Sequence, residues 1–479
     1  MDADKRELTR YLCAAVQTDE RFCDQIVEEI LNEEHQAIGI AYGIDLPTVL
    51  KSCLISQRRK IRRDALLSII SLLSLLSLIS GVHFPVLISL YLVAWLIVFQ
   101  EEKTSRYEII AKYALKSNFK PEFFESLRVE PSIENRLKVI GEEQSGNAII
   151  YGGFSPFVGS GVNVGGWSFV IDIGKGKEDI GGQLLKVSPF QVSEMYKYIT
   201  DSILKLGLSN LKIRDNLYVN GEEIRDDLLF LSHPLAHPST QVSPVTVKKF
   251  IENPTHTVRH YRCFRVTDWQ GELALSGFIR LVIVEQSLFI EVNYCLLTPL
   301  SNYYRQFDAI QLPKARELWD LAKKTFWKTV FILIAAPSKL IEKQSSSWQK
   351  RRQRKRKQRE ILENPLFNYG AAASLRERVS QSEYRRYFQK LDQEMYAKII
   401  ERRIIDSITS FLSNKNVDVS DLKETRSTIL NNGVIVSGGS VAANNIAVGN
   451  QATANNTTVG GQMKSILNLS QLGNAPKAD

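Results

Sequence analysis

The sequence predicts an α+β protein with N-terminal helices, a transmembrane helical hairpin, a cytoplasmic domain with a largely antiparallel β-sheet, a long C-terminal helix and a short β-rich Gly/Asn tail. Three observations lead to this fold class. Residues 65–99 contain no Asp, Glu, Lys or Arg, which is typical of membrane-spanning segments. Residues 146–297 are rich in β-branched and aromatic residues without a regular alternation with helices, which favours an antiparallel sheet. Apolar residues recur at helical spacing in the flanking segments.

The chain divides into segments that differ in composition and periodicity. They are a helical arm at 1–62, the transmembrane hairpin at 63–100, a helical connector at 101–144, the cytoplasmic α+β domain at 145–312, a membrane-interfacial segment with a basic run at 313–362, a long helix at 363–412 and a Gly/Asn-rich oligomerisation or disordered tail at 413–479.

The uncharged block is interrupted once, at Gly81 and Pro85, which predicts a turn between two apolar helices. A soluble buried hairpin and a shallow re-entrant hairpin remain as alternatives. Cations precede the first helix and follow the second, whereas the turn carries none, so the positive-inside rule places both termini in the cytoplasm. The residues expected in the membrane are Leu66, Leu73, Leu76, Ile79, Leu87, Leu92, Trp95 and Phe99.

Serines recur every third residue in the first apolar helix, at Ser68, Ser71, Ser74 and Ser77. Small side chains let helices approach one another closely, so the stripe predicts helix packing within or between chains. A serine-lined pore in an oligomer is the alternative, although no ionisable residue marks an ion path within the block.

The α+β domain contains a helix at 191–208 with Val192, Met195, Tyr196, Ile199 and Ile203 on one face. The dipeptide Asn220-Gly221 predicts a hairpin turn.

A glycine-rich stretch places Gly159, Gly161 and Gly165 before Trp167. The spacing fits neither a dinucleotide fingerprint nor a Walker A loop. It predicts a kinked β-hairpin or bulge, or a loop that holds a ligand through its backbone amides.

The sequence favours a non-enzymatic protein without a cofactor or a metal. Histidines occur in pairs four residues apart, at 233 and 237 and at 256 and 260, but neither pair has a clear third ligand. The chain contains no recognised hydrolase, metalloprotease or kinase motif. The five cysteines are widely spaced, as in cytoplasmic proteins with reduced thiols.

A dense basic run follows a short apolar stretch at 325–341, which Lys328 interrupts and Pro337 is expected to end. The run supplies eight of the positive charges in a chain of net charge +9, at Lys350, Arg351, Arg352, Arg354, Lys355, Arg356, Lys357 and Arg359. An apolar wedge beside clustered cations favours anionic lipid headgroups as the partner. Nucleic acid is the second choice, and a solvated linker is the third reading.

Residues 375–412 have apolar residues at helical spacing, and the following Gly/Asn-rich tail has the composition of short β-turns or of a disordered segment. We therefore expect homo-oligomerisation through 375–479.

The stretches YGGFSPFVGSGVNVGGWSF, NPLFNYGAAASLRE and ILNNGVIVSGGSVAANNIAVGNQA, with the hairpin, resemble uncharacterised bacterial, actinobacterial-type multi-pass membrane proteins. The resemblance covers most of the chain and implies a bacterial inner-membrane location. It carries no site residues. The expected function is that of a signalling or defence-type membrane effector whose cytoplasmic domain senses a ligand or partner. A membrane-tethered nucleic-acid binder that uses 350–359, and an enzyme with an unrecognised site, are the alternatives.

Overall fold

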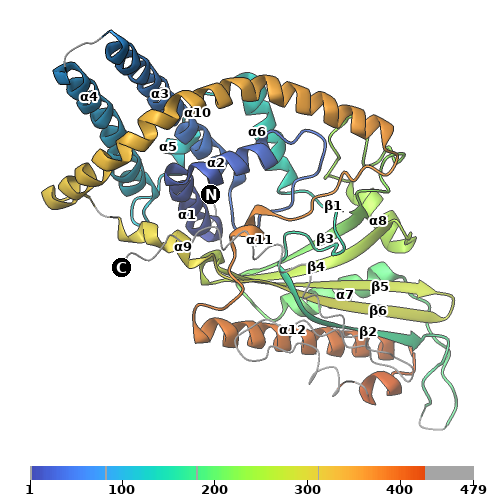
Figure 1. Ribbon diagram of the computed structural model, residues 1–479. Coiled ribbons are helices and arrows are strands. Elements are labelled where there is room, and N and C mark those ends of the chain that lie inside the picture. Colours follow the sequence, from blue (N-terminus) through green and yellow to red (C-terminus); the bar gives the residue numbers. More distant parts are fainter. Residues whose placement is uncertain (1–2, 81–83, 180–181, 311, 425, 427–479) are drawn as a thin grey trace.

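The computed structural model describes residues 3–80, 84–179, 182–310, 312–424 and 426 (Figure 1). It consists of a helical layer, a helical hairpin that projects from this layer, and a mixed sheet with helices on one face. The predicted α+β class is confirmed. The predicted turn at Gly81 and most of the tail, 427–479, lie outside the described residues.

The helical layer is built around one apolar core. Its elements are α1 (Ala3–Thr18), α2 (Glu20–Ile26), the π-helical turns η1 (Val27–Leu31) and η2 (Thr104–Ala114), α5 (Pro121–Glu125), α6 (Pro131–Glu143), α9 (Asn302–Arg305), η4 (Gln306–Ala309) and α11 (Leu375–Val379). The core includes Leu8, Leu12, Val49 and Phe124, all buried. The predicted helical arm therefore packs as part of a folded layer.

Three long helices meet beside this layer. They are α3 (Leu46–Ile79), α4 (Phe84–Lys103) and α10 (Ala315–Glu363). The first half of α3 belongs to the layer, whereas its second half and α4 form a hairpin that projects away from the sheet (Figure 1). The longest helix, α10, crosses the hairpin and continues over the layer.

The expectation that Pro337 ends an apolar helix is wrong, because α10 is continuous through this residue. Proline removes one backbone hydrogen bond from a helix. Here the neighbouring Ala336 is buried in a small core with Leu67 and Ile70 of α3 and with Ala94 and Val98 of α4. This packing holds α10 against α3 and α4 just before the proline, and the ion pair of Lys339 with Glu20 holds it just after.

The sheet contains β1 (Ala148–Tyr151), β2 (Val162–Asp172), β3 (Leu211–Asn220), β4 (Val258–Asp268), β5 (Leu273–Val284) and β6 (Ser287–Leu297). The strand order is β1-β3-β4-β5-β6-β2. Only the β1–β3 pair among these strands is parallel. The sheet is therefore largely antiparallel, as expected from its composition.

Helices cover one face of the sheet. They are α7 (Val192–Leu204), α8 (Pro244–Glu252) and α12 (Tyr387–Asn414) (Figure 1). All five residues predicted for the inner face of α7 are buried against this face. The other face carries a smaller cluster, in which Phe157 stacks on Phe278 with 4.1 Å between the ring centroids.

The segment after α10 differs from the predicted long helix at 363–412. Residues 364–374 leave the helix and run beside β1, where Ala371 N–H donates to Ile150 and Gly152 N–H donates to Ala371. This contact covers the edge of the sheet, an arrangement that limits edge-to-edge pairing. Pro365 and Gly370 disfavour a helix in this segment, and the long helix begins only at Tyr387.

The predicted hairpin turn at Asn220-Gly221 is also wrong, since α8 lies between β3 and β4 in the chain. Gly221 instead makes room for another segment of the chain. A Cβ added here would lie 2.1 Å from the backbone nitrogen of Gly370. The glycine therefore allows the segment after α10 to cross the end of β3.

Candidate membrane interface

The hairpin presents an apolar surface that no other part of the described chain covers. Of the residues predicted to contact the membrane, Leu66, Leu73, Leu76, Ile79 and Leu92 are exposed, with exposed fractions from 42% for Leu92 to 75% for Ile79. Leu87, Trp95 and Phe99 are half-buried. Within the described residues, one continuous helical stretch, Phe84–Ala114, has the length and composition to cross a membrane.

Half-burial of Trp95 follows from its contact with α10. Its indole N–H donates to the carbonyl of Ala322 at 3.0 Å, and the Tyr91 hydroxyl donates to the carbonyl of Phe326 at 2.6 Å. The Phe326 ring packs edge-on against both aromatic rings. These residues therefore fix where α10 crosses the hairpin.

The four predicted packing serines are all half-buried. The hydroxyls of Ser68 and Ser74 donate to the carbonyls of Asp64 and Ile70, one turn earlier in α3. Such bonds satisfy a hydroxyl inside its own helix. The small side chains remain compatible with close helix packing.

Charged residues form a polar collar around the base of the hairpin. It comprises Arg59, Lys60, Arg63 and Asp64 of α3, Glu101 and Glu102 of α4, Glu20 of α2, and Lys328 and Lys339 of α10. Arg63 binds Asp64 at 2.6 Å and lies 3.7 Å from Glu101. Lys328 forms an ion pair with Glu102. The collar marks the level at which the apolar hairpin ends and the polar body begins.

Lys60 lines a cavity of about 120 Å³ inside the polar collar. Its side-chain nitrogen is buried and has no hydrogen-bond partner among the described residues. Burial lowers the pKa of Lys60, although Glu20 and Glu101 oppose this effect by charge. A water occupies roughly 30 Å³ in the liquid, so the cavity has room to solvate the ammonium.

Two cations of the basic run pair with acidic residues of the helical layer. Arg354 binds Glu34 at 2.9 Å and Lys357 binds Glu33 at 2.6 Å, which ties the end of α10 to the loop after η1. Arg352, Lys355, Arg356 and Arg359 are exposed, and so is the side chain of Arg354 despite its ion pair. The side chains of Lys350 and Arg351 lie outside the described residues.

The glycine-rich loop binds a carboxylate of the chain itself. The amides of Gly159 and Gly161 donate to Oε1 of Glu377 at 2.8 and 3.0 Å. Its Oε2 accepts from the amide of Ser374, in a capping box at the start of α11. Both glycines have φ of +89°. The amides considered for a ligand are thus occupied by Glu377.

The other two residues of the predicted loop lie in β2. Gly165 sits at an irregularity in the pairing of β2 with β6. The Trp167 indole donates to Glu401 of α12 at 3.1 Å. Burial raises the pKa of Glu401 to about 7, although the bond from Trp167 favours the charged form. These contacts join the loop region to α12.

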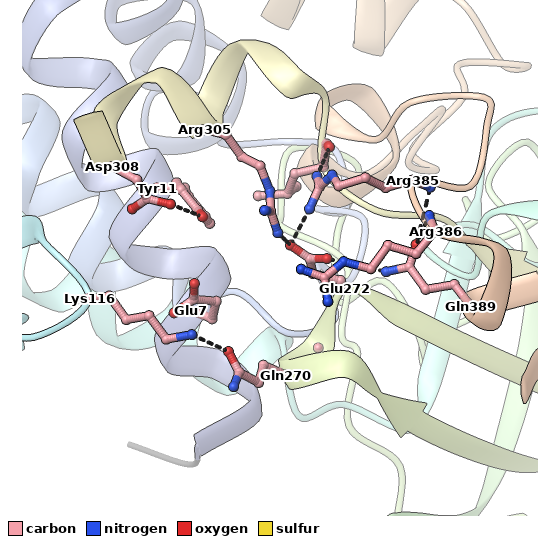
Figure 2. Close-up of polar contacts among 12 residues, drawn as sticks. Glu7, Tyr11, Lys116, Gln270, Glu272, Arg305, Asp308, Arg385, Arg386 and Gln389 are labelled. Carbon is pink, nitrogen blue, oxygen red and sulfur yellow. Dashed lines mark hydrogen bonds and ion pairs between the residues drawn. The ribbon is translucent and has the colours of Figure 1, made fainter. Parts of the chain in front are cut away.

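A second polar cluster, absent from the sequence predictions, lies between the helical layer, the sheet and α12 (Figure 2). At its centre is Glu272, which is 5% exposed. Its Oε1 accepts from Arg305 of α9 at 2.6 Å and from Arg385 before α12 at 2.7 Å. Burial disfavours the charged carboxylate, but the two arginine hydrogen bonds outweigh it and lower the pKa of Glu272.

The backbone that precedes Glu272 is strained, and the arginine that binds the carbonyl of Glu272 is buried. Trp269 and Gln270 have φ of 55° and 58°, a conformation that costs of order 1 kcal/mol or more for residues other than glycine. Arg376 is fully buried and donates to the carbonyls of Glu272 and Thr298 at 2.9 and 2.7 Å. Burial lowers the pKa of Arg376 to about 10. These two hydrogen bonds from Arg376 hold the strained turn in place.

The same cluster continues into the segment that leads to α10. Asp308 of η4 accepts from Arg10 at 2.6 Å and from Tyr11 at 2.5 Å. Arg305 and Asp308 lie between β6 and α10 in the chain. We call Glu272, Arg305, Arg385, Arg10 and Asp308 the junction cluster, since they connect the sheet, α12 and α1 to the start of α10.

In each predicted histidine pair, one histidine contacts a carboxylate from another part of the chain. His260 binds Asp215 at 2.9 Å and His237 binds Glu143 at 2.6 Å. No group of three or more His, Cys, Asp or Glu side chains is placed to hold a metal ion in the described part of the chain. His237 and His260 each take part in a polar contact with a carboxylate.

Sequence reasoning missed the junction cluster because its members lie far apart in the chain and show no local motif. One local motif could have been recognised in the sequence, because Ser374 and Glu377 have the spacing of a capping box. It predicts the start of α11, though not the contact of Glu377 with Gly159 and Gly161.

Comparison with known proteins gives one match. The model of a family described as the AbeC-like domain matches residues 166–444, more than half of the chain. No curated protein and no solved structure matches. The matched region begins within β2 and includes the junction cluster residues Glu272, Arg305 and Arg385, together with α10 and α12.

Proposed function

The chain belongs to the AbeC-like domain family, and we propose that it is a non-enzymatic bacterial cell-membrane protein that transmits a signal between its α+β domain and its hairpin. The hairpin lies in the bilayer, and the α+β domain and both termini lie in the cytoplasm. The α+β domain binds a ligand or partner, and copies of the chain assemble through 375–479.

The observation that carries this proposal is the uncovered apolar surface of the hairpin. Exposed apolar side chains follow α3 from Leu66 to Ile79 and α4 from Phe84 to Leu96. Burying one such side chain is worth roughly 1.5–3 kcal/mol. Soluble monomers seldom expose an apolar patch of this extent, which marks an interface with a membrane or a partner.

The dimensions of the hairpin favour a membrane over a protein partner. The apolar part of α4, residues 84–99, spans about 24 Å at 1.5 Å per residue. This is most of the ~30 Å hydrocarbon core of a bilayer. The polar collar begins where the apolar surface ends. Ionic residues at one end of an apolar hairpin suit the boundary between lipid and water.

The junction cluster supports the signalling part of the proposal. Arg305 and Asp308 form the polar ties of the short segment between β6 and α10. Arg385 and Arg305 donate together to the same oxygen of Glu272. A partner that shifts α12 and its Arg385 would change how tightly this segment is held. Such a shift would pass to α10 and, through Trp95, to the hairpin.

Membrane fractionation of the full-length chain tests the proposal. We expect the wild-type protein to stay in the membrane pellet after an alkaline carbonate wash, which removes peripheral proteins. The variant Leu73→Lys/Leu76→Lys places two charges in the exposed hairpin surface and should lower the retained fraction severalfold, because each charge costs about 2.5–3.5 kcal/mol at the centre of a spanning helix.

The matched control is Leu204→Lys/Leu228→Lys. These two leucines are 54% and 81% exposed, on the α+β domain. Adding the same charges there should leave membrane retention unchanged. A wild-type chain that is released by carbonate, or equal effects of the two variants, would contradict membrane insertion of the hairpin.

A further inference from the structure

The outward face of α10 is apolar in one half and cationic in the other. Its exposed apolar residues are Trp319, Trp327, Phe331, Ile334 and Ile341, with exposed fractions of 62–75%. They occur at positions i, i+8, i+12, i+15 and i+22, which share one side of a helix with 3.6 residues per turn. Residues with this spacing form a continuous stripe.

The exposed cations continue the same stripe. Five helical turns take 18 residues, so Arg359 lies on the same side of α10 as Ile341, and Arg352 on the same side as Ile334. Lys355 and Arg356 fall between them, and all four are exposed. One side of the helix thus changes along its length from a half rich in aromatic and aliphatic residues, where Arg316, Asp320 and Lys323 are also exposed, to a cationic half.

The opposite side of α10 faces the rest of the molecule. Leu321, Thr325 and Ala336 are buried. The cations of this side pair with acidic residues of the body: Lys328 with Glu102, Lys339 with Glu20, Arg354 with Glu34 and Lys357 with Glu33. The four cations that pair with the body therefore lie on the side of α10 opposite the stripe.

We propose that the outward face of α10 lies on an anionic bilayer surface. Trp319, Trp327 and Phe331 enter the boundary between headgroups and acyl chains, and Lys355, Arg356 and Arg359 contact the phosphates of anionic lipids. The inference rests on the proposed membrane function and adds to it a lipid preference and a defined contact face. Trp is enriched at membrane interfaces, and an apolar face combined with cations is typical of helices that lie in the plane of the interface.

The apolar half decides between lipid and nucleic acid as the partner. Phosphate contacts alone would require only the cationic half. The stripe also adjoins the hairpin. Phe326, next to the exposed Trp327, packs against Tyr91 of α4. Leu333, next to the exposed Ile334, packs against the small core between α3, α4 and α10. A partner that covers both halves must offer an apolar layer beside phosphates, which a bilayer does.

The chain provides two variants matched in charge and residue type. Lys355→Gln/Arg359→Gln removes two outward cations, and Arg354→Gln/Lys357→Gln removes two that pair with the body. Full-length protein in a neutral detergent is titrated with phosphatidylglycerol that carries a fluorophore accepting energy from tryptophan. The same titration with labelled phosphatidylcholine measures binding without a net negative headgroup.

We expect the wild type and the inward variant to prefer phosphatidylglycerol. The outward variant should bind it about 10- to 30-fold more weakly, since each cation near an anionic surface contributes about 1 kcal/mol and 1.4 kcal/mol corresponds to a tenfold change. Its affinity for phosphatidylcholine should not change. Added salt should weaken the preference of the wild type.

Two results would overturn the inference: equal binding of phosphatidylglycerol by the outward variant and the wild type, or an equal loss in the inward variant. A titration with duplex DNA completes the test, because loss of DNA binding without loss of lipid preference would assign the face to nucleic acid. Failure of the carbonate test affects the hairpin alone. The lipid titration is performed in detergent and does not depend on insertion.

Discussion

The carboxylate of Glu272 lies 2.6 Å from the guanidinium of Arg305, which ties the start of β5 to the short helix that leads into α10. Both residues belong to the segment matched by the family model. The contact gives the sheet a direct connection to the helix that crosses the hairpin.

Removing this charge should destabilise the fold strongly. Glu272→Gln leaves Arg305 and Arg385 without their shared carboxylate in a buried site. Breaking a buried ion pair by removing one partner costs roughly 3–5 kcal/mol. We expect a clearly lower midpoint of thermal unfolding for the detergent-solubilised chain. The exposed Glu223→Gln serves as the control, and an equal midpoint for both variants would show that the cluster adds no stability.

Glu401 should make stability fall as the pH rises towards neutrality. Its pKa is about 7 in the folded protein, above the ordinary value of about 4.3 expected when unfolded. The folded state therefore holds the proton more tightly, and its advantage disappears as the pH rises from about 4 through 7. The full loss would be of the order of 3 kcal/mol.

The Glu401→Gln variant should lack this pH dependence, because its amide stays neutral and its oxygen still accepts from Trp167. Unfolding followed at pH 5 and pH 8 checks the prediction, and subtraction of the variant from the wild type isolates the contribution of Glu401. A difference between the two proteins that stays constant with pH would contradict it.

Gly159→Ala should destabilise the chain by more than about 2 kcal/mol. The residue has φ of +89°, and an added Cβ would lie 2.3 Å from the carbonyl oxygen of Ile40. Both strain and overlap oppose the substitution. Gly153→Ala is the control, since no atom lies within 4 Å of its added Cβ. Denaturant unfolding of both variants measures the difference, and similar stability would argue against the tight approach to Ile40.

Trp95→Phe should loosen α10 from the hairpin. The change removes the hydrogen bond to Ala322 and keeps an aromatic ring. A loss of about 1 kcal/mol is expected from one such bond, seen as faster backbone hydrogen exchange in 319–336. Trp319→Phe, at a residue that is 62% exposed, should leave exchange in that segment unchanged. Faster exchange in both variants would attribute the effect to ring size instead.

Local periodicity predicted those parts of the fold that depend on neighbouring residues. Helical spacing identified the buried face of α7, and the uncharged block identified the two arms of the hairpin. Composition identified the strands. These features depend on residues within one element, so a single sequence contains enough information to find them.

The features that the sequence did not predict depend on contacts between residues far apart in the chain. Pro337 remains helical because α3 and α4 pack against α10 at the preceding residues, up to Ala336. Asn220-Gly221 forms no hairpin turn because the chain passes through α8 before β4, and Gly221 lies against Gly370 instead. The partition of the basic run required the positions of Glu33 and Glu34, more than 300 residues away in the chain. Glu272 and its arginines likewise meet only after folding.

The proposed membrane location of the hairpin is tested most directly by spin labels on full-length protein reconstituted into lipid bilayers. The five native cysteines are buried, so labels on Ser77→Cys, Ser338→Cys and Ser209→Cys report the hairpin, α10 and the α+β domain. We expect dissolved oxygen to relax the label at 77 more than a water-soluble nickel chelate does, the label at 338 to be intermediate and the label at 209 to show the reverse. A label at 77 that the nickel chelate reaches as readily as one at 209 would contradict insertion of the hairpin into the bilayer.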